Sequence, residues 1–85
     1  MATAMTGDVD VTMPKMGATM TEGTVALWRV RPGDAVRSGG VLCEVETDKV
    51  RIDVESEYDG TIRELVVPEG TTVEVGAIIA RLSLA

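Results

Sequence analysis

Apolar and polar residues alternate along most of this chain with a period of two, and nowhere for long with the 3.6-residue period of a helix. Glycine, proline, aspartate or serine interrupts the alternation every few residues, which is typical of all-β proteins. The pattern predicts eight short strands, at residues 9–13, 23–30, 34–37, 41–47, 50–55, 60–67, 71–74 and 77–83.

The chain also repeats itself. Residues 22–46 align without a gap with residues 59–83, at a constant offset of 37 residues. The identical pairs are Gly23/Gly60, Thr24/Thr61, Val30/Val67, Gly33/Gly70, Val36/Val73 and Gly39/Gly76. Because half of these pairs are glycines, we expect turns with positive φ at all three places in both copies. The repeat predicts an all-β flattened barrel or sandwich of two four-stranded antiparallel sheets, related by a pseudo-twofold axis.

The alternation fails in one predicted strand. Val25 and Leu27 share one face of it, whereas Ala26, Trp28 and Val30 fall on the other face. A β-bulge, or a strand that passes between the two sheets, would account for the change.

Two residues, Asp48 and Lys49, separate the predicted strands 41–47 and 50–55. A loop this short predicts a tight hairpin with Val45 opposite Ile52 and Cys43 opposite Val54. Since neither central residue is glycine, we expect a type I turn. The amine of Lys49 would stand clear of the body on a rigid mount, where an enzyme could acylate it. Most lysines in exposed turns have no function, so this feature alone does not identify a site.

Composition excludes several classes of function. The net charge of -6 argues against nucleic acid as a partner, and we interpret Arg29, Arg31 and Arg37 as a solvated edge. With one cysteine and no histidine, we expect no disulfide, no metal site and no catalytic Ser-His or Cys-His set, hence no enzyme activity of its own. We expect no membrane span, a flexible leader at 1–8, one domain at 9–84, a monomer, and a bacterial cytoplasm or organelle matrix as its location.

The motifs resemble those of lipoyl domains from the acyltransferase component of 2-oxo acid dehydrogenase complexes, in the biotinyl/lipoyl carrier family. The match covers residues 9–84, and the motifs occur in the family's order: Met13-Pro14-Lys15-Met16-Gly17, Met20-Thr21-Glu22-Gly23-Thr24, Pro32-Gly33-Asp34-Ala35-Val36, Glu46-Thr47-Asp48-Lys49-Val50 and Val67-Pro68-Glu69-Gly70. The resemblance implies that lipoic acid is attached to Lys49 by an amide. It also implies that Glu46, Thr47, Asp48 and Val50 help modifying enzymes to recognise the target, and that the loop from Pro14 to Glu22 lies near the hairpin tip and helps to choose a partner.

The resemblance further implies a swinging-arm carrier with several partners. A lipoate ligase or lipoyl transferase would attach the cofactor. A thiamine-diphosphate-dependent 2-oxo acid decarboxylase would load an acyl group, an acyltransferase domain would receive it, and dihydrolipoamide dehydrogenase would reoxidise the cofactor.

Two alternatives stay open. A biotinyl carrier domain of a carboxylase shares this fold, although such domains typically flank the lysine with methionines, where this chain has Asp48 and Val50. An unmodified protein-binding module could also use the carrier fold. A lipoyl protein of the glycine cleavage system fits less well, because that family carries additional elements.

Overall fold

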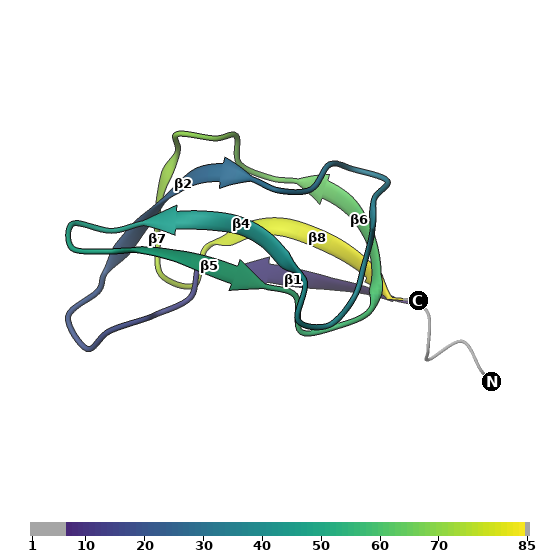
Figure 1. Ribbon diagram of the computed structural model, residues 1–85, viewed down its shortest axis with the longest axis horizontal. Helices are drawn as coiled ribbons and strands as arrows, with labels where there is room; N and C mark the ends of the chain where they lie inside the picture. The colour runs from purple at the N-terminus through teal and green to yellow at the C-terminus, as the bar shows by residue number, and fades with distance from the viewer. Residues whose placement is uncertain (1–6, 85) are drawn as a thin grey trace.

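Eight strands and no helix make up residues 7–84, the part of the chain that the computed structural model describes (Figure 1). The strands are β1 (Asp8–Thr12), β2 (Glu22–Trp28), β3 (Ala35–Val36), β4 (Val41–Glu46), β5 (Arg51–Glu55), β6 (Gly60–Leu65), β7 (Thr72–Glu74) and β8 (Ile78–Leu84). All eight predicted strands are therefore confirmed, with ends that differ by no more than two residues. β1 begins at Asp8, and residues 1–6 of the predicted leader lie outside the described residues.

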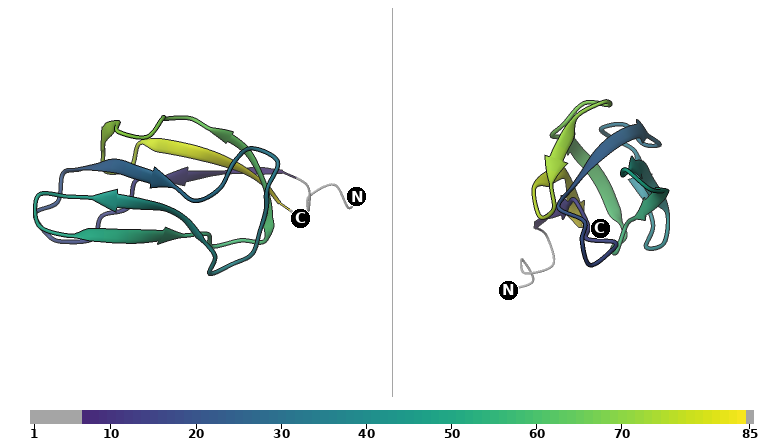
Figure 2. Two further views of the ribbon diagram at one scale, coloured as in Figure 1. Left: turned by 45° about the horizontal axis from the view of Figure 1, so that its top comes forward. Right: turned by 90° about the vertical axis from the view of Figure 1, so that its left-hand side faces the viewer.

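The strands form two antiparallel sheets of four, in the orders β1-β8-β6-β3 and β5-β4-β2-β7. Every strand pairing in the described chain lies within one of the two sheets. The sheets therefore face each other as a sandwich and do not close into a barrel, as the end-on view in Figure 2 shows. The predicted all-β fold of two four-stranded sheets is confirmed.

The two sheets are built alike. Strands β2, β3 and β4 of the first repeat correspond to β6, β7 and β8 of the second, and β5 occupies the place in its sheet that β1 occupies in the other. Backbone hydrogen bonds follow the same rule: Gly33 N–H donates to Ile62 O at 2.7 Å, and Gly70 N–H donates to Val25 O at 2.7 Å. The repeat in the sequence is thus a repeat in backbone structure.

The irregular strand contains a β-bulge. The register between β2 and β4 shifts between Val25 and Leu27, and the register between β6 and β8 shifts between Ile62 and Glu64, the equivalent positions in the second copy. Of the two explanations for the broken alternation, the bulge is correct. Because an added residue turns the following side chains to the other face, Leu27 and Trp28 are both half-buried.

The repeated glycines serve two different purposes. Gly33 and Gly70 have φ of 96° and 88°, and Gly39 and Gly76 both have φ of 92°, so the predicted turns at these four positions are confirmed. The same prediction was wrong for Gly23 and Gly60, which lie inside β2 and β6 without positive φ. There, a side chain is excluded by crowding: a Cβ on Gly60 would lie 2.2 Å from the carbonyl oxygen of Ser83.

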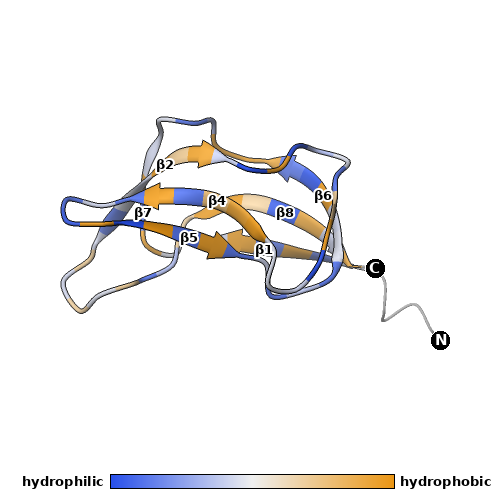
Figure 3. Ribbon diagram, in the orientation of Figure 1, coloured by the Kyte–Doolittle hydropathy of each residue, from blue (hydrophilic) through white to orange (hydrophobic). Residues whose placement is uncertain are grey.

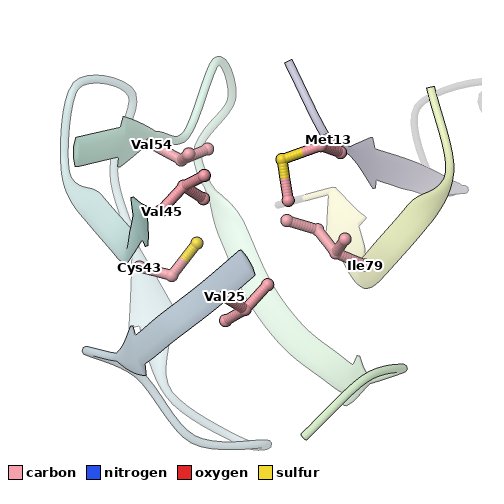
Figure 4. Packing of buried hydrophobic residues seen from close by; sticks show 6 residues of the cluster. All are labelled: Met13, Val25, Cys43, Val45, Val54 and Ile79. Carbon is pink, nitrogen blue, oxygen red and sulfur yellow. The ribbon is translucent and has the colours of Figure 1, made fainter. Parts of the chain in front are cut away.

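Apolar side chains from both sheets fill the space between them. Figure 4 shows the larger of two buried clusters, to which the β5-β4-β2 side contributes Val25, Cys43, Val45 and Val54, and the facing side contributes Met13 and Ile79. The smaller cluster consists of Leu42, Ile62 and Leu82. Each fully buried aliphatic side chain of this kind contributes roughly 1.5–3 kcal/mol to the free energy of unfolding. The core therefore holds β4 rigidly, and β4 carries the hairpin described next.

Candidate functional site

Lys49 lies at the tip of the hairpin between β4 and β5, at one end of the sandwich (Figure 1). Val45 pairs with Ile52 and Cys43 pairs with Val54, so the predicted register is confirmed. The register places apolar side chains of both strands toward the core and leaves Asp48, Lys49 and Val50 exposed. In Figure 3 this tip is hydrophilic, whereas the strands behind it are largely hydrophobic. The lysine is thus mounted on the end of two packed strands.

The turn itself is closed by a side chain. Thr47 N–H donates to the carbonyl oxygen of Val50 at 2.8 Å, but Val50 N–H donates to the hydroxyl of Thr47 at 3.1 Å and not to its carbonyl oxygen. A second amide, that of Lys49, also donates to the Thr47 hydroxyl, at 3.2 Å. No residue other than glycine has positive φ within residues 7–84, which excludes the type I′ and II′ turns that usually close such hairpins. The negative φ fits the expected type I turn, whereas the hydroxyl replaces that turn's usual carbonyl acceptor.

Ion pairs stabilise the outer face of the hairpin at its base. Glu44 on β4 accepts a hydrogen bond from Arg51 Nε on β5 at 2.9 Å, and its other oxygen pairs with Arg29, which follows β2. The hydrogen bond from Arg29 and the charges of both guanidinium groups lower the pKa of Glu44 below its usual value. Glu44 therefore stays ionised at neutral pH and links the hairpin to the neighbouring strand.

A groove of about 480 Å³ runs beside the lysine. One wall is the hairpin tip, residues 46–50, and the other is formed by residues between Met16 and Glu22, in the connection between β1 and β2 and at the start of β2. Figure 2 shows the hairpin and this connection at the same end of the sandwich. Met16 and Val50, on opposite walls, are 53% and 54% exposed and are two of the four exposed large apolar side chains in the described chain. The prediction that the loop from Pro14 to Glu22 lies near the tip is confirmed. The resemblance predicted the place of this loop but gave Met16 and Met20 no role of their own, because only the folded chain shows that both line the groove.

The surroundings of the lysine are acidic. Glu22, Glu46 and Asp48 line the same groove as Lys49, and all four side chains are exposed. Among the ion pairs found within residues 7–84, none involves Lys49. Its amine is therefore accessible to a reagent or an enzyme, inside a patch that carries net negative charge.

A second, larger groove lies elsewhere. A groove of about 610 Å³ separates the edge strands β1 and β5 and includes none of residues 46–50. Within the described range, no group of three His, Cys, Asp or Glu side chains is arranged to hold a metal ion. Residues 7–84 also contain no helix that is long and apolar enough to cross a membrane.

A sandwich of two small sheets with a lysine at a hairpin tip is the arrangement of a cofactor-carrier domain. Residues 9–82 match the family model described as "Biotin-requiring enzyme", the biotin/lipoyl family. A solved structure, the lipoyl domain of the 2-oxoglutarate dehydrogenase complex from Azotobacter vinelandii, superimposes with a TM-score of 0.71 at 39% sequence identity. The superposition covers 87% of this chain and 94% of that one.

Three curated relatives are similarly close. The acetyltransferase component of the pyruvate dehydrogenase complex from Rhizobium meliloti is 47% identical over 76 residues. The lipoamide acyltransferase component of the branched-chain alpha-keto acid dehydrogenase complex from Bacillus subtilis is 47% identical over 72 residues. The succinyltransferase component of the 2-oxoglutarate dehydrogenase complex from Staphylococcus saprophyticus is 46% identical over 71 residues. These matches cover 88%, 85% and 84% of this chain, but the chain spans only 17% of the length of each relative.

The chain therefore belongs to the biotin/lipoyl carrier family, and its predicted resemblance to lipoyl domains of 2-oxo acid dehydrogenase acyltransferase components is confirmed. A domain of this kind is a carrier and not itself a catalyst.

Proposed function

We propose that this domain carries lipoic acid on Lys49 and shuttles an acyl group between the enzymes of a 2-oxo acid dehydrogenase complex. The observation that supports the proposal most directly is the position of Lys49, which is exposed at the tip of a rigid two-residue hairpin in a chain of the lipoyl type. The relatives named above are acyltransferase components of such complexes.

The residues present suit the attachment. A lipoate ligase activates the carboxyl group of lipoate with ATP, which forms an acyl adenylate and releases pyrophosphate. The neutral amine of Lys49 then attacks the acyl carbon. A carbon–nitrogen bond forms, the bond from the acyl carbon to the bridging oxygen breaks, AMP leaves with that oxygen, and the two protons that the ammonium group loses on becoming an amide pass to solvent. Because Lys49 has no ion-pair partner within residues 7–84, none has to be displaced before it reacts.

When bound, the lipoyl group would supply a redox-active disulfide that can carry an acyl group. The proposed partners are a thiamine-diphosphate-dependent decarboxylase that would load the acyl group, an acyltransferase domain that would receive it, and dihydrolipoamide dehydrogenase, which would restore the disulfide. The protein contributes position. A long arm on a compact domain raises the local concentration of the acyl group at each tethered active site.

Four residues around the lysine are proposed as the recognition set for modifying enzymes: Glu46, Thr47, Asp48 and Val50. Glu46, Asp48 and Val50 are exposed, and all four line the groove beside Lys49. Their carboxylates suit an enzyme with a basic rim, and Val50 offers it an apolar contact. The wall from Met16 to Glu22 is proposed to contact the decarboxylase.

The relatives named for acetyl, branched-chain and succinyl transfer are 47%, 47% and 46% identical to this chain, so overall similarity does not favour one of them. We further propose that the domain is monomeric and acts in a bacterial cytoplasm or organelle matrix. The net charge of -6 disfavours self-association, and the free thiol of Cys43 suits a reducing compartment.

The decisive experiment is the intact mass of the protein, with peptide mapping, after co-expression with a lipoate ligase. We expect one lipoyl group on Lys49, and none in Lys49→Arg, which keeps the charge and the fold but removes the amine. The chain has only one other lysine, Lys15, in the neighbouring loop, so Lys15→Arg is a matched control that should stay fully modified. Modification that persists in Lys49→Arg would contradict the assignment.

Co-expression with a biotin ligase tests the alternative cofactor. A biotinyl group on Lys49 would place the protein with the carboxylases, and no modification by either ligase would favour an unmodified binding module. We expect lipoylation alone, because Asp48 and Val50 flank the lysine where biotinyl domains typically have methionines.

A further inference from the structure

The hydroxyl of Thr47 makes three hydrogen bonds within the hairpin tip. It accepts the amide N–H groups of Lys49 at 3.2 Å and of Val50 at 3.1 Å, and it donates to the carbonyl oxygen of Val50 at 3.1 Å. The side chains of Glu46, Asp48, Lys49 and Val50 make none that the structure records within residues 7–84. Thr47 is also the only half-buried residue of these five, and its hydroxyl is engaged within the turn.

The turn needs this hydroxyl for a physical reason. Two-residue hairpins usually adopt turns with positive φ, which glycine and asparagine supply, and Asp48 and Lys49 both have negative φ. A backbone of this kind splays the strands, and here the amide of Val50 does not reach the carbonyl oxygen of Thr47. The amide of Val50 donates to the hydroxyl of Thr47 instead. Because a β-branched side chain is restricted about χ1, threonine holds that hydroxyl in place at little entropic cost.

We propose that Thr47 is a positioning residue for the modification of Lys49. Its hydroxyl holds residues 48–50 in one backbone conformation, so that the amine reaches the active site of the lipoate ligase from a fixed direction. Thr47 acts through the backbone and does not contact the cofactor. This inference rests on the proposed function, because it concerns the same lysine and the same class of enzyme.

The test is the kinetics of lipoylation by a purified lipoate ligase with lipoate and ATP, followed by intact mass. Thr47→Val keeps the shape of the side chain and removes the hydroxyl, and we expect kcat/KM to fall about three- to tenfold, the loss typical of one or two hydrogen bonds. Thr47→Ser restores the hydroxyl and should recover most of the rate. The matched control is Thr61→Val, an exposed threonine on β6 without a recorded side-chain hydrogen bond, which should leave the rate unchanged.

Two further measurements separate positioning from general damage. Acylation of Lys49 by a small reagent such as an acetyl ester should proceed equally fast in Thr47→Val and the unaltered protein, because the amine itself is unchanged. In the unaltered protein, the amides of Lys49 and Val50 should exchange with solvent several times more slowly than in an unstructured peptide, and Thr47→Val should abolish that protection.

Three outcomes would contradict the inference, and only one of them would also contradict the proposed function. Equal lipoylation of Thr47→Val and the unaltered protein would overturn the inference while leaving the proposed function intact. Unprotected amides at residues 49 and 50 in the unaltered protein would also overturn it, whether or not any variant folds. If the unaltered protein is not lipoylated at all, both the inference and the proposed function fail together.

Discussion

Gly60 occupies the tightest backbone contact among the glycines of the molecule. A Cβ at this position would lie 2.2 Å from the carbonyl oxygen of Ser83 on β8, an atom that the sheet holds in place. At the equivalent Gly23, a Cβ would meet only side-chain atoms, with Met13 Sδ at 2.8 Å and Val45 Cγ1 at 2.9 Å. Sheet backbone yields less readily than the end of a methionine side chain.

Alanine at these two glycines should therefore have unequal effects. We expect Gly60→Ala to lower the free energy of unfolding by about 3 kcal/mol and Gly23→Ala by about 1–2 kcal/mol, as overpacking in cores does. Gly17→Ala is the control, since Gly17 has open space around it and no positive φ, and it should change stability by less than about 0.5 kcal/mol. Urea unfolding of the three variants measures this. Equal stability of Gly60→Ala and Gly17→Ala would disprove the close approach.

The environment of Cys43 leads to a prediction about how the stability of the protein depends on pH. Burial, and secondarily the nearby charges of Asp53 and Glu44, raise the pKa of its thiol from 9.0 to about 12. The folded protein therefore retains the thiol proton at a pH where the unfolded chain has released it. The resulting contribution to stability is complete below pH 9 and is lost between pH 9 and about 12, by at most about 1.4 kcal/mol per pH unit.

The alkaline loss of stability should disappear when the thiol is removed. Cys43→Ala is a mild replacement, because the equivalent residue of the second repeat is already Ala80, which is fully buried. We expect the difference in unfolding free energy between the unaltered protein and Cys43→Ala to be constant from pH 6 to 8 and to shrink above pH 9. Denaturant unfolding at a series of pH values measures it, and a difference that stays constant up to pH 11 would show that the thiol ionises freely in the folded state.

At the scale of elements, the two repeats use the same turn before their short middle strands, β3 and β7. Gly33 and Gly70 have nearly the same positive φ, and each donates its N–H at 2.7 Å to the strand that its own short strand pairs with. Neither glycine has an atom within 4 Å of a notional Cβ. The need for glycine at these turns is thus purely conformational, in contrast to Gly60.

Valine at either turn should cost stability through backbone strain alone. We expect Gly33→Val and Gly70→Val each to lower the free energy of unfolding by about 1–3 kcal/mol, and by similar amounts because the turns are equivalent. Gly33→Asn should cost less, since asparagine tolerates positive φ better than a β-branched residue does. Thermal midpoints, read by circular dichroism, are the measurement. Midpoints unchanged by valine would mean that the turns relax to a different backbone.

At the scale of the whole molecule, the tip of the β4–β5 hairpin lies at one end of the sandwich, and the start of β1 and the end of β8 lie at the other end (Figure 1). Leu84 N–H donates to Gly7 O at 2.9 Å, so the first and last described residues are neighbours. A tether attached at either end therefore leaves the groove and Lys49 free, which is the geometry that a carrier on a flexible linker requires.

Fusion to a folded partner should not impair the modification of Lys49. We expect a globular domain joined to either terminus through a flexible linker to leave the rate of lipoylation within about twofold of that of the isolated domain, because the linker starts at the far end. The rate is measured by intact mass with a lipoate ligase. A loss of more than tenfold for either fusion would show that the ligase also contacts the end of the sandwich that carries the termini.

Local pattern was enough to predict much of this protein. Strand positions, the register of the β4–β5 hairpin and the exposure of Lys49 all follow from the period of two and from a two-residue loop, which are properties of neighbouring residues. The pseudo-twofold arrangement followed from the repeat, because two similar sequences adopt the same backbone. The resemblance to lipoyl domains indicated the family. The motifs that carry this resemblance lie at turns and at the hairpin tip, where similar sequences adopt the same backbone.

Only the tertiary structure decided the rest, because it depends on residues far apart in the chain. Gly23 and Gly60 look like turn glycines in the sequence and prove to be contact glycines, since the atoms that exclude a Cβ belong to other strands. The resemblance placed the connection from β1 to β2 near the tip, but only the folded chain shows that the two segments form a groove, with Met16 and Val50 exposed on opposite walls. The hydroxyl of Thr47 closes the turn because its backbone leaves one amide without a carbonyl acceptor, a three-dimensional geometry that a one-dimensional pattern does not contain.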